Sequence, residues 1–185
     1  MGKDKSQHQT SLEIVNVVGS GDLSREIDLS VLCENLGEKT AEYEVGQSAL
    51  FFRPQNHTGL VMAYRTGKYI VRGGGSYESL YQVNTIFLNE LLDLGIISNI
   101  DEIPFSVQNV VFVGDIGEGV ILENLVIQLG LEKTEFEPEQ FPGLVYRPDD
   151  FDCVFLVFGT GKVVITGSSD EDESRRAFEK LKSKI

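Results

Sequence analysis

Residues 14–23 read IVNVVGSGDL, and residues 107–116 read VQNVVFVGDI. The two stretches match with an offset of 93 positions, which aligns Asn16 with Asn109. The same offset holds further along the chain for four pairs of leucines or glycines: Leu29/Leu122, Leu32/Leu125, Leu36/Leu129 and Gly37/Gly130. Because self-similarity at a fixed period is typical of duplicated structural units, the sequence predicts a fold built from two copies of one unit.

The match continues towards the end of the chain with one change of offset. EYE at 42–44 still matches EFE at 135–137, whereas RTGKYIVRGG at 65–74 matches GTGKVVITGS at 159–168 with an offset of 94. The second copy is therefore about one residue longer between these stretches. We expect four segments along the chain: a leader at 1–11, a first repeat at 12–97, a linker at 98–104 and a second repeat at 105–185.

Each copy predicts the same order of strands. In the first copy an alternating strand at Ile14–Val18 precedes a short helix at 29–36 and a strand that ends in a hairpin tip. Three further strands follow at 49–53, 59–65 and 68–72. A Thr-Gly-Lys turn joins the last two, and its glycine supplies the positive φ of a tight hairpin.

A longer helix closes each copy. The first begins near Ser76, and its apolar residues at 80, 83, 87, 91 and 94 follow the spacing of one helix face. The second begins near Ser169, with acids at 170–173 and lysines at 180, 182 and 184, an order that complements the helix dipole. Strands followed by a helix, twice over, predict an α+β fold with antiparallel sheets.

Composition narrows the function classes. A net charge of −13 argues against nucleic-acid binding, which needs Lys and Arg, but proteins of a very salty cytoplasm also carry excess acid. Cys33 and Cys153 have apolar neighbours, and with two distant histidines they form no metal-ligand spacing. We therefore expect two reduced core thiols, no metal, and an intracellular protein. No apolar run approaches the roughly 18 residues of a membrane span.

The chain resembles the archaeal TATA-box-binding proteins, in particular at FEPEQFPGLVYRPDD (136–150), at GTGKVVITGS (159–168) and at IVNVV with SGDL in the first copy. The resemblance implies a saddle of two pseudo-symmetric halves, with one curved antiparallel sheet and helices on its convex side. The concave face would sit on the minor groove of A/T-rich promoter DNA and bend it.

The resemblance also implies which residues touch DNA. Minor-groove edges of A·T pairs offer only acceptors, and guanine adds an obstructing amino group, so a smooth apolar face with a few amide or hydroxyl groups suits A·T-rich DNA. The central base contacts would be Asn16, Val18, Asn109, Val111 and Thr166. Recurrence of the Asn and Val at matching places favours this role over that of a buried, hydrogen-bonded asparagine.

The tip of the second copy is expected to do two things. Phe141, stiffened by Pro142, would pair with Phe158 as a wedge that opens a base step. Arg147 and Lys162 would reach the phosphates beside it. The flank of the same tip, by resemblance, would dock transcription factor B through Glu137, Glu139 and Gln140.

The first copy departs from the family pattern. Gln47, or Ser48 if the extra residue is placed differently, stands where the tip phenylalanine is expected, and Tyr64 holds the second wedge position. Arg72 replaces the counterpart of Thr166, while Arg53 and Lys68 keep the phosphate-contact positions. No Lys or Arg occurs from 73 to 132. We therefore expect weaker or asymmetric bending, most of it from the Phe141 half.

The sequence thus predicts a general transcription initiation factor that recruits transcription factor B and, indirectly, RNA polymerase, in the cytoplasm on the nucleoid. One alternative stays open: a diverged paralogue that contacts DNA poorly and acts as a regulator or decoy of transcription factor B. Another is a two-repeat small-molecule binder, which would need an apolar pocket. An enzyme is not expected, because the TGK turns lack the Ser/Thr and spacing of a phosphate-binding loop. We expect no cofactor, no small-molecule substrate and no membrane contact.

Overall fold

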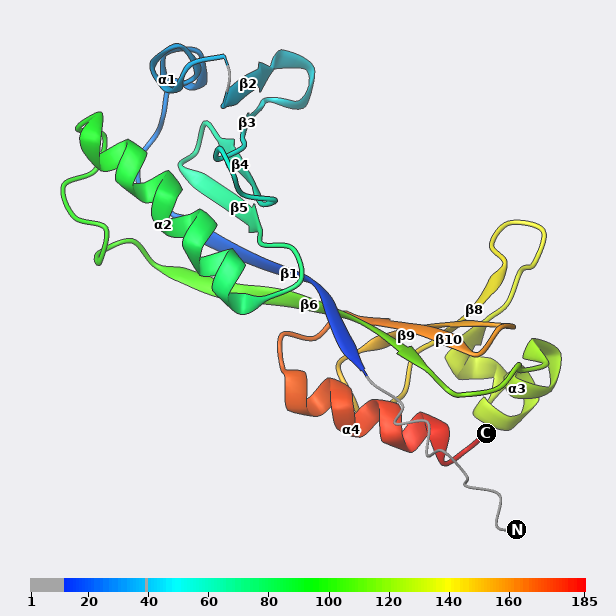
Figure 1. The fold of residues 1–185 in the computed structure, drawn as a ribbon. Helices are drawn as coiled ribbons and strands as arrows, with labels where there is room; N and C mark the ends of the chain where they lie inside the picture. Colours follow the sequence, from blue (N-terminus) through cyan, green and yellow to red (C-terminus); the bar gives the residue numbers. More distant parts are fainter. Residues whose placement is uncertain (1–11, 39) are drawn as a thin grey trace, which may run out of the picture. The chain divides into compact units, whose positions relative to one another are not determined.

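The computed structural model describes residues 12–38 and 40–185, so the expected leader at 1–11 lies outside the described residues. Contacts divide the chain into two compact units. The first unit comprises Val15–Asn109, and the second comprises Val110–Ile185 together with residues 12–14. Each unit contains antiparallel strands and two α-helices (Figure 1).

The first unit contains one long strand, a short helix, four further strands and a long helix. Its sheet has the order β2-β3-β4-β5-β1-β6, in which β6 continues into the second unit. The elements are β1 (Glu13–Asp22), α1 (Leu29–Leu36), β2 (Ala41–Glu44), the 3-10 turn η1 (Val45–Gln47), β3 (Ala49–Phe52), β4 (Leu60–Tyr64), β5 (Lys68–Arg72), α2 (Tyr77–Asp93) and β6 (Phe105–Asp115).

The second unit repeats this order with the strand sequence β6-β10-β9-β8-β7. Its elements are α3 (Leu122–Leu129), the 3-10 turn η2 (Leu131–Lys133), β7 (Thr134–Glu135), β8 (Gly143–Tyr146), β9 (Val154–Phe158), β10 (Lys162–Thr166) and α4 (Glu171–Lys182). The offset of 93 places α1 on α3 residue for residue. Two repeats, antiparallel strands and helices confirm the predicted α+β class.

One face of each half-sheet forms a core with the long helix of its unit. In the first unit the ring of Tyr69 packs 5.3 Å from that of Phe87 on α2, and both side chains are fully buried. In the second unit Phe178 on α4 and Phe155 on β9 are buried in the same way. Apolar burial on this scale is the main stabilising contribution to each unit, and it leaves the opposite sheet face uncovered by the long helix.

Local signals account for the ends of several elements. The Ser76 hydroxyl accepts a hydrogen bond from the Ser79 amide, and Asp170 does the same for Glu173, so both long helices begin at capped positions. Gly67 and Gly161 have φ of 86° and 88° in the two Thr-Gly-Lys turns, as the hairpin prediction requires.

Three sequence predictions about burial and length need correction. The first strand was expected to end at Val18, but β1 continues to Asp22. Leu94 was placed on the apolar face of the closing helix, yet it follows the helix and is 38% exposed. Cys153 is buried as expected, whereas Cys33 is half-buried rather than in the core. In the described part of the chain no helix is long and apolar enough to cross a membrane.

Candidate nucleic-acid interface

The sheet face that points away from the core carries the predicted residues of the first unit. Val18 lies opposite Arg72 in the antiparallel register, and Arg72 lies opposite Leu60 on its other side. Antiparallel partners project to the same face, and Asn16 shares it because side chains alternate along a strand. Val17, between Asn16 and Val18, is fully buried in the core. Asn16, Val18 and Arg72 therefore lie together on the open face.

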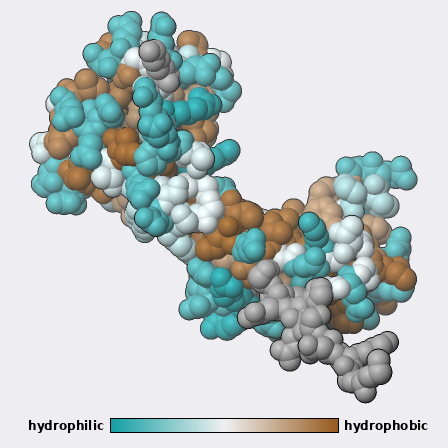
Figure 2. Space-filling model, viewed as in Figure 1, coloured by the Kyte–Doolittle hydropathy of each residue, from teal (hydrophilic) through white to brown (hydrophobic). Residues whose placement is uncertain are grey.

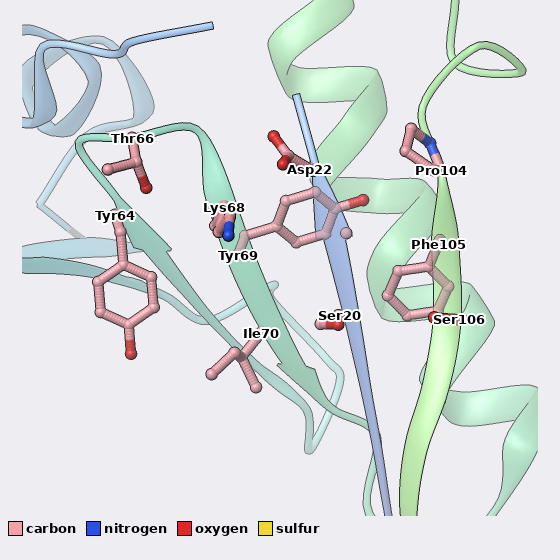
Figure 3. A pocket seen from close by; sticks show the side chains of 11 residues that line it. Ser20, Asp22, Tyr64, Thr66, Lys68, Tyr69, Ile70, Pro104, Phe105 and Ser106 are labelled. Atoms are coloured by element: carbon pink, nitrogen blue, oxygen red, sulfur yellow. The ribbon is translucent and has the colours of Figure 1, made fainter. Parts of the chain in front are cut away.

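A pocket of about 720 Å³ opens on the first unit near the end of the β4–β5 hairpin (Figure 3). Tyr64, Thr66 and Lys68 border it from the hairpin, while Ser20 and Asp22 border it from β1. Tyr64 and Lys68 are two of the predicted DNA contacts, so this pocket is part of the candidate interface. Its lining is mostly apolar, from aromatic and aliphatic side chains, and adds several hydroxyl groups, one carboxylate and one ammonium.

The open face of the second unit is smoother and more apolar. Val113, Val164, Leu156 and Val145 form one row across four strands, each directly opposite the next. Each is half-buried, and hydrophobic surface gathers over β9 and β10 in Figure 2. Such a surface can approach a groove floor closely without leaving unpaired polar groups.

Four further predicted contacts lie on β6 and β10. Thr166 continues β10 and lies opposite Val154, and Lys162 lies at the other end of β10, opposite Asp115. Asn109 and Val111 on β6 are half-buried and alternate with fully buried residues. The structure therefore brings these four predicted contacts to the open side of their strands.

Phe141 and Phe158 contact each other at the start of β8. Their ring centroids lie 5.8 Å apart in an edge-on arrangement of 65°. Gly143 makes this contact possible, because a Cβ there would lie 2.8 Å from the Phe141 ring. The Phe141 amide donates to the Glu137 carbonyl at 2.9 Å, which closes the turn before the strand. Both rings are half-exposed.

The strand register aligns the two tips from the strand that follows each. Ala49 pairs with Tyr64, just as Gly143 pairs with Phe158, so Gln47, two residues before Ala49, matches Phe141 when counted from this pair. Gln47 is exposed in η1 and its amide donates to the Glu44 carboxylate.

The three predicted partner-binding residues lie in the loop between β7 and β8. Glu137, Glu139 and Gln140 are all exposed there. The Glu137 carbonyl accepts the amides of both Gln140 and Phe141, so the loop has a defined turn beneath its acidic side chains. These acids lie directly before the half-exposed ring of Phe141.

Sequence reasoning missed carboxylates beside the predicted phosphate contacts. Arg53 lies 3.8 Å from Glu42, and Arg147 lies 3.5 Å from Glu135. The matching EYE and EFE segments indicated a repeated acid, but only the structure shows that each acid lies within ion-pair distance of an arginine. Among the described residues, no cluster of three or more His, Cys, Asp or Glu side chains could hold a metal.

A model of the family described as transcription factor TFIID (or TATA-binding protein, TBP) matches residues 11–94 and 104–185. The chain belongs to the TATA-binding protein family. TATA-box-binding protein C of Halobacterium salinarum is 45% identical over 95% of this chain and 97% of its own length. The TATA-box-binding protein of Archaeoglobus fulgidus is 37% identical over 94% of both chains. The solved structure of Methanococcus jannaschii TBP is similar with a TM-score of 0.79 and 38% identity, over 94% of this chain and 97% of that one.

Proposed function

We propose that this family member binds A/T-rich promoter DNA in the minor groove and acts as a general transcription initiation factor. The observation that carries the proposal is the open sheet face, on which an asparagine and a valine recur at matching places of β1 and β6. Cations border that face at Arg53, Lys68, Arg147 and Lys162. The full-length similarity to proteins named TATA-box-binding proteins supports the same function.

The residue types fit the minor groove of A·T pairs. Amide groups of Asn16 and Asn109 donate hydrogen bonds to the adenine N3 and thymine O2 acceptors. Valine and leucine side chains fill the groove floor, where the amino group of a guanine would prevent close approach. Arg72 favours a narrow A·T-rich groove, whose negative potential attracts arginine. Phosphate contacts then fix the register without reading the sequence.

Bending is assigned chiefly to the second unit. Phe141 and Phe158 together present two half-exposed rings that can enter a base step and partly unstack it. Gln47 and Tyr64 hold the matching places in the first unit. An amide cannot replace the stacking of a ring, and the hydroxyl of Tyr64 requires a polar partner once water is excluded. The DNA in the proposed complex is therefore kinked more strongly where it contacts the second unit.

The acidic loop before Phe141 is proposed to dock transcription factor B, which in turn recruits RNA polymerase. Glu137 and Glu139 would repel DNA phosphates but attract a basic protein surface. Glu137, Glu139 and Gln140 are exposed while the loop backbone is held by its own turn. The side chains are thus available to a partner without refolding of the loop.

A binding assay separates this function from that of a decoy for transcription factor B. Fluorescence anisotropy in molar salt would compare an A/T-rich promoter box with a G/C-rich duplex of equal length, with and without transcription factor B. Without the factor, we expect the A/T-rich box to bind at least tenfold more tightly than the G/C-rich duplex, a difference in binding free energy of about 1.4 kcal/mol or more. With the factor, we expect the A/T-rich box to bind more tightly still. Binding that depends entirely on the factor would favour the decoy. The similarity to several TATA-box-binding proteins over 95% of the chain supports the first outcome.

A further inference from the structure

The short helix α3 of the second unit is followed by exposed apolar surface that its counterpart α1 lacks. Ile127 on α3 is 76% exposed, and Leu131 in η2 is 75% exposed. The offset of 93 between the repeats matches these residues with Glu34 and Glu38 of the first unit, both of them exposed. Hydrophobic surface is visible over α3 in Figure 2. The same part of the repeated unit is therefore charged in the first copy and apolar in the second.

The start of α3 shows the same exchange. In α1 the Asp28 side chain accepts the amides of Ser30 and Val31 and so caps the helix. Its counterpart Ile121 has a side chain that cannot accept a hydrogen bond, and this side chain is 64% exposed. Replacing an acidic N-cap by an aliphatic residue weakens a helix. The isoleucine at this position therefore does not serve the folding of α3.

Packing within the second unit does not account for the exposed side chains either. Helix α3 is anchored by Leu122, Leu125 and Leu129, which are buried. Ile127 projects to the other side of the helix, because two residues after Leu125 correspond to a rotation of about 200°. An apolar side chain in water gains nothing from the hydrophobic effect, and several of them within a short exposed segment are typical of an interaction site.

The charges around α3 indicate the chemistry of the partner. Residues 118–142 contain one cation, Lys133, and six glutamates, at 118, 123, 132, 135, 137 and 139. Lys133 forms an ion pair with Asp149 of the same chain. A second copy of this chain would bring like charges together at this surface, whereas a basic protein surface would be attracted to it. The occupant that fits is therefore a protein whose apolar contact residues are bordered by Lys and Arg.

The exposed apolar residues lie next to the acidic loop that is proposed to dock transcription factor B. Leu131 and the rest of η2 lead directly into β7, and the loop with Glu137 and Glu139 follows β7. Helix α3 also contacts both β7 and β8, the two strands that this loop connects. Helix and loop thus belong to the same end of the second unit and can contact one partner.

We propose that Ile127 and Leu131 form an apolar part of the docking surface for transcription factor B, separate from the acidic loop. The inference rests on the proposed function, because it concerns the same partner. The two parts respond differently to salt. At molar salt the Debye length is about 3 Å, so attraction by Glu137 and Glu139 is largely screened. Burial of apolar side chains is not screened in this way, so α3 maintains docking when the acidic loop no longer does.

The test measures the affinity of the full chain for labelled transcription factor B by fluorescence anisotropy, without DNA, at about 0.2 M and about 2 M potassium chloride. We expect Ile127→Gln with Leu131→Gln to weaken binding about 30-fold at both concentrations, as for the loss of two interface contacts. Glu137→Gln with Glu139→Gln is expected to weaken it about tenfold at the lower concentration and less than about threefold at the higher one.

A matched control removes exposed apolar surface from the first unit, as Val31→Gln with Val45→Gln, at side chains 52% and 73% exposed. This variant is expected to bind transcription factor B like wild type, and thermal denaturation should show all variants folded. An α3 variant that binds like the control would overturn the inference, while a loss in the loop variant would leave the proposed function standing. A wild type that dimerises in sedimentation through α3, with an α3 variant that stays monomeric, would assign the surface to a second copy and also overturn it. Wild type that does not bind transcription factor B at either salt concentration would instead overturn the proposed docking.

Discussion

The ring of Phe141 lies edge-on against that of Phe158, with centroids 5.8 Å apart, at a place where the first unit has Gln47 and Tyr64. The two repeats thus share a strand register, but only the second has a pair of phenylalanine rings at this place. An inserted aromatic ring offsets the free-energy cost of unstacking two bases, because the bases stack on the ring instead. The asymmetry of side chains therefore predicts an asymmetry of bending.

Replacing Phe141 with alanine tests the wedge directly. Fluorescence transfer between dyes at the two ends of a bound A/T-rich duplex reports the bend. We expect Phe141→Ala to reduce the bend angle substantially and to weaken binding by about 1–3 kcal/mol, the range for loss of one base–aromatic contact. A full bend in this variant would show that the ring of Phe141 is not needed for bending.

The reciprocal change adds a ring to the first unit. Gln47→Phe places an aromatic where the register matches Phe141, next to Tyr64. We expect a larger bend and tighter binding than in wild type, measured by the same fluorescence transfer. Val45→Phe is the control, because Val45 lies in the same turn and is already 73% exposed. Equal effects of the two substitutions would mean that added hydrophobicity, not position, drives the change.

A buried hydrogen bond distinguishes the core of the first unit. The Tyr69 hydroxyl donates to Asn84 Oδ1 at 2.9 Å, and burial raises the pKa of Tyr69 well above its usual range. Tyr69→Phe leaves the Asn84 amide without this partner, which costs about 1–3 kcal/mol in the free energy of unfolding. Urea denaturation would measure the loss. Tyr81→Phe, at a side chain 49% exposed, is expected to stay within about 0.5 kcal/mol of wild type.

The second unit shows how that polar pair can be replaced. At the positions that match Tyr69 and Asn84 it has Val163 and Phe178, both buried and apolar. Replacing both members of a hydrogen-bonded pair by apolar groups can be nearly neutral. Tyr69→Phe combined with Asn84→Leu is therefore expected to recover most of the stability lost in Tyr69→Phe alone. A double variant less stable than the single one would contradict this account.

The turn glycines give a prediction with an internal control. Gly161 has a φ of 88°, and a Cβ there would lie 2.1 Å from the Glu118 carbonyl oxygen. Gly117 has a φ of 100°, but a Cβ on Gly117 would have no atom within 4 Å. Gly117→Ala is expected to lower the free energy of unfolding by roughly 1–2 kcal/mol, from backbone strain alone. Gly161→Ala is expected to lower it by more, because the chain at Glu118 must also move. Equal losses of stability in the two variants, measured by thermal denaturation, would rule out the close approach of Gly161 to Glu118.

Most of the fold could be predicted from the sequence because its signals are local or repeated. Helix α1 was predicted at its observed bounds, and the turn glycines were recognised from Thr-Gly-Lys. The length of β1 was not predicted correctly, because Gly19 and Gly21 are typical of the end of a strand. In the structure these glycines continue the strand and make room for rings: a Cβ would lie 2.4 Å from Phe105 and 2.3 Å from Tyr69. Tertiary packing, not local preference, explains them.

The candidate site was predictable where the two copies agree and less so where they differ. Asn16 and Asn109 follow from the repeat, and the register places each on an open strand face. The counterpart of Phe141 was left between Gln47 and Ser48, because a one-residue insertion in a turn leaves no sequence mark. The pairing of Ala49 with Tyr64 fixes the strand that follows the turn. Glu42 beside Arg53 was missed because a contact between neighbouring strands depends on a register that sequence alone does not give.

The two thiols are expected to react very differently. Burial, with a smaller contribution from Glu173, raises the pKa of the Cys153 thiol to about 12, while Cys33 is half-buried on α1. The thiolate is the reactive form, so iodoacetamide at pH 8 should label Cys33 and leave Cys153 unmodified until urea unfolds the chain. Because the folded pKa of Cys153 is the higher one, its contribution to stability is complete below the unfolded pKa of about 8.5 and declines as pH rises above it. Mass spectrometry of the peptides would measure the labelling of each cysteine. Equal labelling of both in the native protein would show that the second-unit core opens readily around Cys153.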